Sequence, residues 1–84
     1  MPVLARFYGI VIRMYFLESE YNPPHIHAIY GDDTAAFDIR TGSILDGSMP
    51  KRATDMVREW ISNNRDKLLE MWETQEYEKL DPLD

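Results

Sequence analysis

The sequence predicts an α+β fold, a three- to four-stranded antiparallel β-meander followed by two C-terminal helices packed on one face. Two observations lead to this prediction. Up to residue 47, short runs rich in aromatic and β-branched residues alternate with turn residues. From residue 50, apolar residues recur at helical spacing. The 84 residues are expected to form a single domain, with the meander at about 3–47, the helices at about 50–78 and a frayed tail at 79–84.

The first predicted strand is residues 7–17, FYGIVIRMYFL, in which aromatic and β-branched residues dominate. Residues 18–24, ESEYNPP, are polar and end in two prolines without a backbone N–H, so a loop is expected there. Strand alternation divides the first strand into two faces, Tyr8, Ile10, Ile12, Met14 and Phe16 on one and Gly9, Val11, Arg13, Tyr15 and Leu17 on the other.

A predicted hairpin follows the two prolines. HIHAIY (25–30) is typical of a strand, GDDT (31–34) of a turn, and AAFDIR (35–40) of the antiparallel partner strand. A second turn at TG (41–42) leads into a short strand, SILDG (43–47). These elements complete the meander.

The helical part begins near Pro50, with Ser48 as the expected N-cap. SNN (62–64) is expected to separate a first helix from a second at about 65–78, although one bent helix fits the same pattern. The residues at helix-core spacing are Ala53, Met56, Val57, Trp60 and Ile61 in the first part and Leu68, Leu69 and Trp72 in the second.

The overall composition narrows the classes of function. The chain contains 9 basic and 15 acidic residues, and this net charge of −6 repels phosphate backbones, so non-specific nucleic-acid binding is not expected. There is no cysteine, which excludes disulfides and thiolate metal ligands. No apolar run is long enough for a membrane span, and no signal peptide is recognisable. The expected location is the cytoplasm, without membrane association.

The chain's two histidines both lie in one motif, NPPHIHA (22–28). If the GDDT turn placed Tyr30 opposite Ala35, His27 would face Asp38 and His25 would face Arg40. The histidines, Asp38 and Arg40 would then share one face, joined by Arg13 and Tyr15 if the first strand paired alongside. The opposite face, packed on the helices, would carry Ile26, Ala28, Tyr30, Ala35, Phe37 and Ile39.

Three interpretations of this cluster remain open at the level of the sequence. Asp38 could accept a hydrogen bond from His27 in a structural pair. Alternatively, His25, His27 and Asp38 could ligate a divalent metal such as zinc, although no fourth ligand is visible and no cofactor is otherwise predicted. In the third interpretation, Arg13 and Arg40 would hold an anion, with a histidine as general acid or base. The candidate binding residues are Arg13, Tyr30, Arg40, Lys51 and Arg52, the last two because basic side chains in a first helical turn oppose the helix dipole.

The order of motifs resembles a family of small bacterial and archaeal proteins known only as domain of unknown function 4160. The resemblance lies in RFYGIVIRMYF (6–16), NPPHIHAIYGD (22–32), FDIRTGSILDGSMPKRA (37–53) and VREWISNNRDKLLEMWE (57–73). It implies a meander followed by helices, and an origin in small operons. Some members of the family are labelled as transcriptional regulators or toxin–antitoxin-like components. The resemblance implies no catalytic role for the shared motif positions, which are Pro23, Pro24, His25, His27, Ala28, Tyr30, Gly31, Pro50, Lys51 and Arg52.

Two hypotheses for the function follow. In the first, the protein is a small binding or regulatory module, one component of a two-gene regulatory or toxin–antitoxin-like pair, and contacts the small protein encoded by the neighbouring gene. The small size, the acidic surface and the lack of a nucleophile beside the histidines favour this hypothesis, and an exposed edge strand would also allow a homodimer. In the alternative, the protein is a hydrolase or ribonuclease-like enzyme that uses His25 and His27, with or without a metal, with Asp38 orienting one imidazole and Arg40 or Arg13 holding a phosphate.

Overall fold

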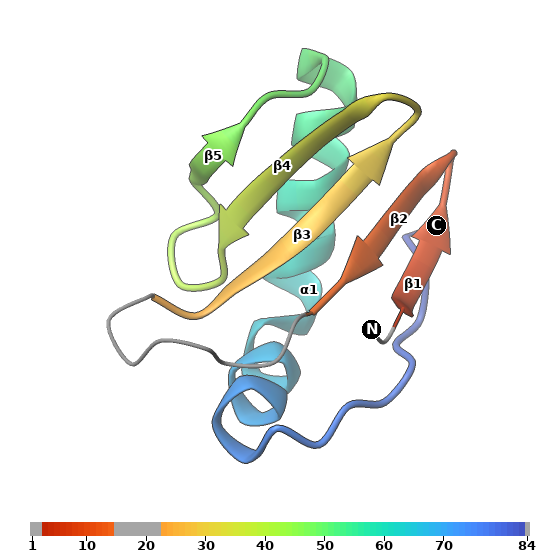
Figure 1. Cartoon of the computed structure of the whole chain (residues 1–84). Coiled ribbons are helices and arrows are strands. Elements are labelled where there is room, and N and C mark those ends of the chain that lie inside the picture. Colours follow the sequence, from red (N-terminus) through yellow and green to blue (C-terminus); the bar gives the residue numbers. More distant parts are fainter. Residues whose placement is uncertain (1–2, 15–22, 84) are drawn as a thin grey trace.

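The computed structural model describes residues 3–14 and 23–83, which form an antiparallel sheet with one helix across one face (Figure 1). The α+β class is confirmed, but the sheet has five strands rather than three or four, and the helical part is one helix rather than two. No helix in this part of the chain is long and apolar enough to cross a membrane. In chain order, which is also the order in the sheet, the elements are β1 (Val3–Phe7), β2 (Ile10–Arg13), β3 (His25–Tyr30), β4 (Asp33–Asp38) and β5 (Ile44–Gly47), followed by α1 (Lys51–Thr74).

The additional strand arises because the segment predicted as one strand over 7–17 folds back on itself. Phe7 of β1 pairs with Ile10 of β2, which leaves Tyr8 and Gly9 as a two-residue turn with φ values of 49° and 80°. Two positive φ values are typical of the type I′ turn, whose twist matches that of antiparallel strands. The expected loop at 18–22 and the predicted position of Tyr15 lie outside the described residues.

The β3–β4 hairpin is two residues out of the predicted register. Tyr30 pairs with Asp33, not with Ala35, so the turn is Gly31–Asp32. Because the error is an even number of residues, every side chain keeps its predicted face. Residues of the predicted apolar face are buried, namely Ile26, Ala28, Ala35, Phe37 and Ile39, whereas Tyr30 at the strand end is exposed.

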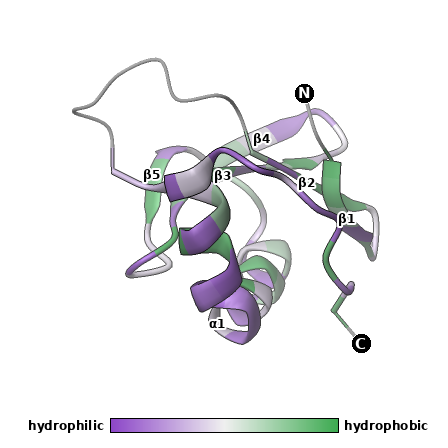
Figure 2. Cartoon of the chain, turned by 90° about the horizontal axis from the view of Figure 1, so that it is seen from below, coloured by the Kyte–Doolittle hydropathy of each residue, from purple (hydrophilic) through white to green (hydrophobic). Residues whose placement is uncertain are grey.

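The core lies between this face of the sheet and α1. Ile10 and Ile12 of β2 pack there with the β3 and β4 residues. The ring centroids of Trp60 in α1 and Phe7 in β1 lie 5.9 Å apart in a tilted arrangement. Hydrophilic and hydrophobic residues alternate around α1, as Figure 2 shows, so the helix buries one stripe. The buried residues of the helix are Ala53, Val57, Trp60, Ile61, Leu68 and Met71.

Helix α1 is continuous but kinked at Asn64, where φ is −125°. The Asn64 side chain donates a hydrogen bond to the Trp60 carbonyl oxygen at 2.9 Å and so replaces a backbone donor at the kink. The SNN signal therefore marks a bend and not a break. At the helix start, Pro50 occupies the N-cap position without a side-chain cap, and the prediction that Ser48 caps the helix is wrong.

The C-terminal segment, where the sequence predicts a frayed tail at 79–84, makes two hydrogen bonds to the rest of the fold. The backbone N–H of Leu80 donates to the carbonyl oxygen of Leu4 in β1 at 2.8 Å. The Trp60 indole N–H donates to the carbonyl oxygen of Asp81, also at 2.8 Å. Figure 1 shows this segment running beside β1, so the β1 edge of the sheet is covered.

Candidate functional site

The two histidines lie near the centre of the sheet, on β3. His25 follows Pro24 as the first residue of the strand, and His27 is the third, so both project from the face opposite the core residues Ile26 and Ala28, which we call the outer face. Both side chains are half-buried, and their ring centroids lie 5.0 Å apart in an edge-on arrangement. The predicted pairing of the two imidazoles on one face is therefore present.

Arg13 of β2 and Ala36 of β4 are the cross-strand neighbours of His27. Asp46 of β5 lies beyond Ala36 in the same row. Burial lowers the pKa of His27 below its usual 6.5, and the charge of His25 acts in the same direction, while Asp46 opposes both. His27 therefore favours its neutral form in the folded protein.

His25 is held by the backbone on one side and by α1 on the other. Its Nδ1 lies 2.8 Å from the carbonyl oxygen of Pro23, so Nδ1 carries the proton and, in the neutral ring, Nε2 is the acceptor. Its ring centroid lies 4.9 Å from that of Trp72 in α1. His25 thus sits at the border between the outer face and the helix.

Asp38 lies opposite His25, so the prediction that it faces His27 is wrong. Its Oδ1 accepts hydrogen bonds from the backbone N–H groups of Arg40 at 2.7 Å and Thr41 at 3.3 Å, which stabilises the turn after β4. Arg40 lies in this turn, beyond the end of β4, and is exposed instead of facing His25. The one-sided cluster of two histidines, Asp38 and Arg40 is not assembled as predicted.

The three metal-ligand candidates are not gathered into a binding set. Within residues 3–14 and 23–83, no group of three or more His, Asp or Glu side chains is placed to hold a metal ion. The Asp38 carboxylate instead serves the backbone of its own turn. The arrangement of these residues therefore does not fit the metal-site interpretation.

Arg13 is the basic residue that the structure brings to the histidines. It lies directly opposite His27, and its Nε is buried without a hydrogen-bond partner. The sequence analysis placed Arg13 on this face only if the first predicted strand paired with the strand of the histidines. The pairing of β2 with β3 meets that condition. The outer face therefore carries two neighbouring imidazoles with an arginine directly opposite one of them.

A groove of about 520 Å³ lies at the other end of the sheet, where α1 begins. Tyr8, Tyr30 and Arg52 line it, and Met56 and Glu59 contribute from α1. Of the two basic residues in the first helical turn, Lys51 instead forms an ion pair with Asp55 at 2.9 Å. The sequence analysis did not single out Tyr8 as a candidate binding residue. The available signal was its position before Gly9, in a two-residue turn where Asn, Asp or Gly is usual.

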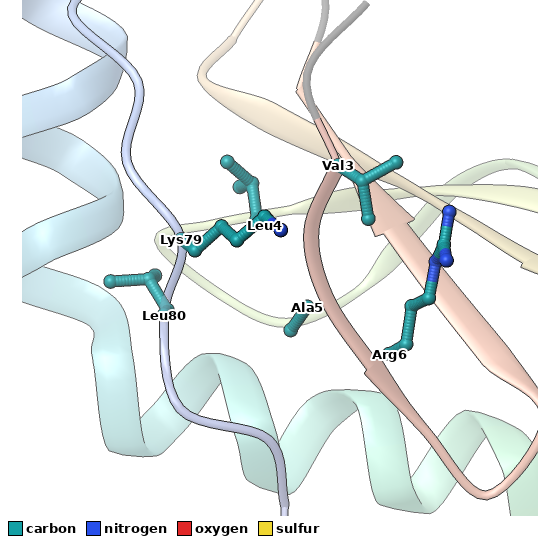
Figure 3. Close-up of a pocket in the computed structure, with 6 residues that line it drawn as sticks. All are labelled: Val3, Leu4, Ala5, Arg6, Lys79 and Leu80. Atoms are coloured by element: carbon teal, nitrogen blue, oxygen red, sulfur yellow. The ribbon is translucent and has the colours of Figure 1, made fainter.

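The two edges of the sheet differ. Beside β1, residues of the strand and of the C-terminal segment line a hollow of about 250 Å³, and Figure 3 shows Lys79 and Leu80 on the side away from the strand. Beside β5, no described residue covers the outer side of the strand (Figure 1). All four β5 residues are exposed, with Ile44 at 39% and Leu45 at 46%.

These features define a small α+β domain with a His-x-His strand at the centre of its sheet. The chain belongs to the family described as domain of unknown function DUF4160, whose match covers residues 9–73. That region includes β2 to β5 and nearly all of α1, while β1 and the C-terminal segment, which pair with each other, lie outside it. No curated protein and no solved structure matches the chain.

Proposed function

We propose that the protein is a small cytoplasmic protein-binding module whose β5 edge pairs with an extended segment of a second protein. The observation that carries this proposal is the exposure of Ile44 and Leu45 on an edge strand that no described residue covers. An uncovered edge offers a row of backbone donors and acceptors, and proteins normally cover or charge such edges. Here the opposite edge, at β1, is covered by the C-terminal segment.

The geometry of β5 suits strand addition. Extended partners gain affinity from backbone hydrogen bonds and specificity from contacts with alternate side chains. Phe37 pairs with Ile44 and Ala36 with Asp46, so Leu45 is the extra residue of a bulge. A bulge re-aims side chains at a sheet edge. The apolar side chains of Ile44 and Leu45 are therefore available to contact the partner beside the backbone pairing.

The charge of the chain favours a basic partner segment. The net charge is −6, and Asp46 places a carboxylate within β5 itself. Complementary charge accelerates association and discriminates against acidic competitors. The resemblance to small operon proteins suggests that the partner is the product of the neighbouring gene, in a regulatory or toxin–antitoxin-like pair.

Co-expression with the neighbouring gene product tests this proposal. We expect a stable complex by size-exclusion chromatography with light scattering, and we expect Ile44→Lys with Leu45→Lys to abolish it. Tyr8→Lys, which alters an exposed apolar residue away from β5, is the matched control and should retain the complex. A complex that survives the β5 double variant would overturn the proposal, and so would self-association of the wild-type chain through Ile44 and Leu45 in place of partner binding.

The alternative function, a hydrolase or ribonuclease-like activity of the histidine pair, is supported by the 5.0 Å separation of the two rings. A neutral His27 is suited to accept a proton. Asp38 and Arg40 do not support it in their predicted roles, because the Asp38 carboxylate binds its own turn and Arg40 lies beyond the end of β4 and not opposite His25. Cleavage of RNA that persists unchanged in the His25→Ala, His27→Ala double variant would exclude this mechanism.

A further inference from the structure

The buried Nε of Arg13 has no hydrogen-bond partner, and this is the one such side-chain atom among the described residues. A buried donor without a hydrogen-bond partner destabilises the folded state, and the effect is larger for a charged group. Such donors are therefore rare in folded proteins. Arginine cannot escape this cost by losing its proton, because its guanidinium stays charged at any physiological pH. A ligand that accepts from the guanidinium would remove the cost.

The strand residues paired with Arg13 supply no carboxylate for this role. Its cross-strand neighbours are Val3 of β1 and His27 of β3, and neither is acidic. The ion pairs of the described residues, Lys51 with Asp55 and Lys67 with Glu78, lie elsewhere. Among residues 3–14 and 23–83, Arg13 therefore has no ion-pair partner, and its half-buried positive charge lies opposite His27.

We propose that Arg13 and His27 form a binding site for a small oxyanion, a carboxylate or phosphoryl group, with His25 at its border. A guanidinium offers paired N–H donors that match two oxygens of such a group. His27 lies directly across the strand pair on the same face, so its imidazole borders the group that Arg13 would bind. This site is separate from the β5 edge and does not depend on the proposed protein binding.

The charges around the site limit what it accepts. Asp46 lies on the far side of Ala36 from His27 and repels anions, so the ligand belongs on the Arg13 side of His27. The net charge of −6 disfavours a polyanion such as a nucleic acid but allows a single small group held by direct contacts. When bound, the oxyanion would favour the protonated form of His27 and oppose the lowering of its pKa by burial, against the unchanged influences of His25 and Asp46.

Titration with inorganic phosphate and, separately, acetate at constant ionic strength tests the site, with the imidazole NMR signals of His27 and the thermal midpoint as readouts. We expect saturable shifts of the His27 signals and a rise in the midpoint with at least one anion. Arg13→Gln should weaken binding about tenfold or more, through loss of charge-assisted hydrogen bonds. Phosphate alone would identify a phosphoryl site, and a response to acetate would identify a carboxylate site.

The matched control is Arg6→Gln, because Arg6 is an exposed arginine on the same face of the sheet, in β1 opposite Val11. It should bind like the wild type. If Arg13→Gln does not fold, Arg13→Lys keeps the charge without the paired donors and should still weaken binding. No saturable shift with either anion, or equal losses in the Arg13 and Arg6 variants, would overturn the proposal.

Discussion

His27 is the residue whose ionisation links the site to the stability of the fold. Burial lowers its pKa in the folded protein below the usual 6.5, which the unfolded chain retains. As the pH falls below about 6.5, the unfolded state binds more protons than the folded state, so the free energy of unfolding decreases. Above that pH, His27 does not change the free energy of unfolding with pH.

We therefore expect His27→Gln to flatten the pH dependence of stability between pH 5 and 7. Urea unfolding at half-unit steps of pH, on the wild type and the variant in a buffer without phosphate or carboxylate, would measure it. Parallel curves for the two proteins across this range would contradict a lowered pKa for His27.

Tyr8 holds an unfavourable backbone conformation in the β1–β2 turn. Its φ of 49° is in the left-handed region, which costs a residue with a β-carbon about 1 kcal/mol or more, and its side chain is 60% exposed. Asn adopts this conformation more readily. Tyr8→Asn should raise the free energy of unfolding by roughly 0.5–1 kcal/mol, measured by chemical denaturation. Tyr8→Ala, which keeps the strain and removes the ring, should bring no such gain, and equal effects of the two changes would refute the explanation.

Substitutions at two glycines of the hairpins distinguish the cost of backbone strain from the cost of steric overlap. Both have positive φ, 60° at Gly31 and 79° at Gly47. A β-carbon on Gly31 would meet no atom within 4 Å, whereas on Gly47 it would lie 2.2 Å from the Thr34 carbonyl oxygen.

Gly31→Ala should therefore cost about 1 kcal/mol from conformation alone. Gly47→Ala should cost at least about 2 kcal/mol more, because β5 must shift away from β4. Paired denaturant curves would measure both. If the two variants were equally stable, the close approach of β5 to β4 at Gly47 would not exist in solution.

The C-terminal segment connects the two layers of the whole molecule. It donates a backbone hydrogen bond to β1, accepts one from Trp60, and packs Leu80 and Leu83 against the core. Each apolar side chain of this size contributes on the order of 1–3 kcal/mol when buried. The segment also covers the β1 edge.

Deleting residues 79–84 should lower the free energy of unfolding by roughly 2–4 kcal/mol and leave the β1 edge uncovered. Thermal denaturation would show the loss of stability, and light scattering would show concentration-dependent self-association. An unchanged midpoint in the truncated chain would mean that the segment does not dock as described. As a control, Lys79→Ala alters an exposed side chain of the same segment and should have little effect on the midpoint.

The sequence by itself determined the class of the fold, the faces of β3 and β4 and the helical part, because these depend on periodicities within short segments. It placed both histidines on the outer face. That placement is correct in spite of a register error of two residues, because side chains alternate between the faces of a strand with a period of two residues. What lies opposite each histidine was decided only by the tertiary structure. The pairing of β2 with β3 places Arg13 opposite His27, and the two-residue turn at Gly31–Asp32 places Asp38 opposite His25. The docking of residues 79–83 likewise depends on a contact between distant segments, the hydrogen bond of Trp60 with Asp81, which local propensity does not encode.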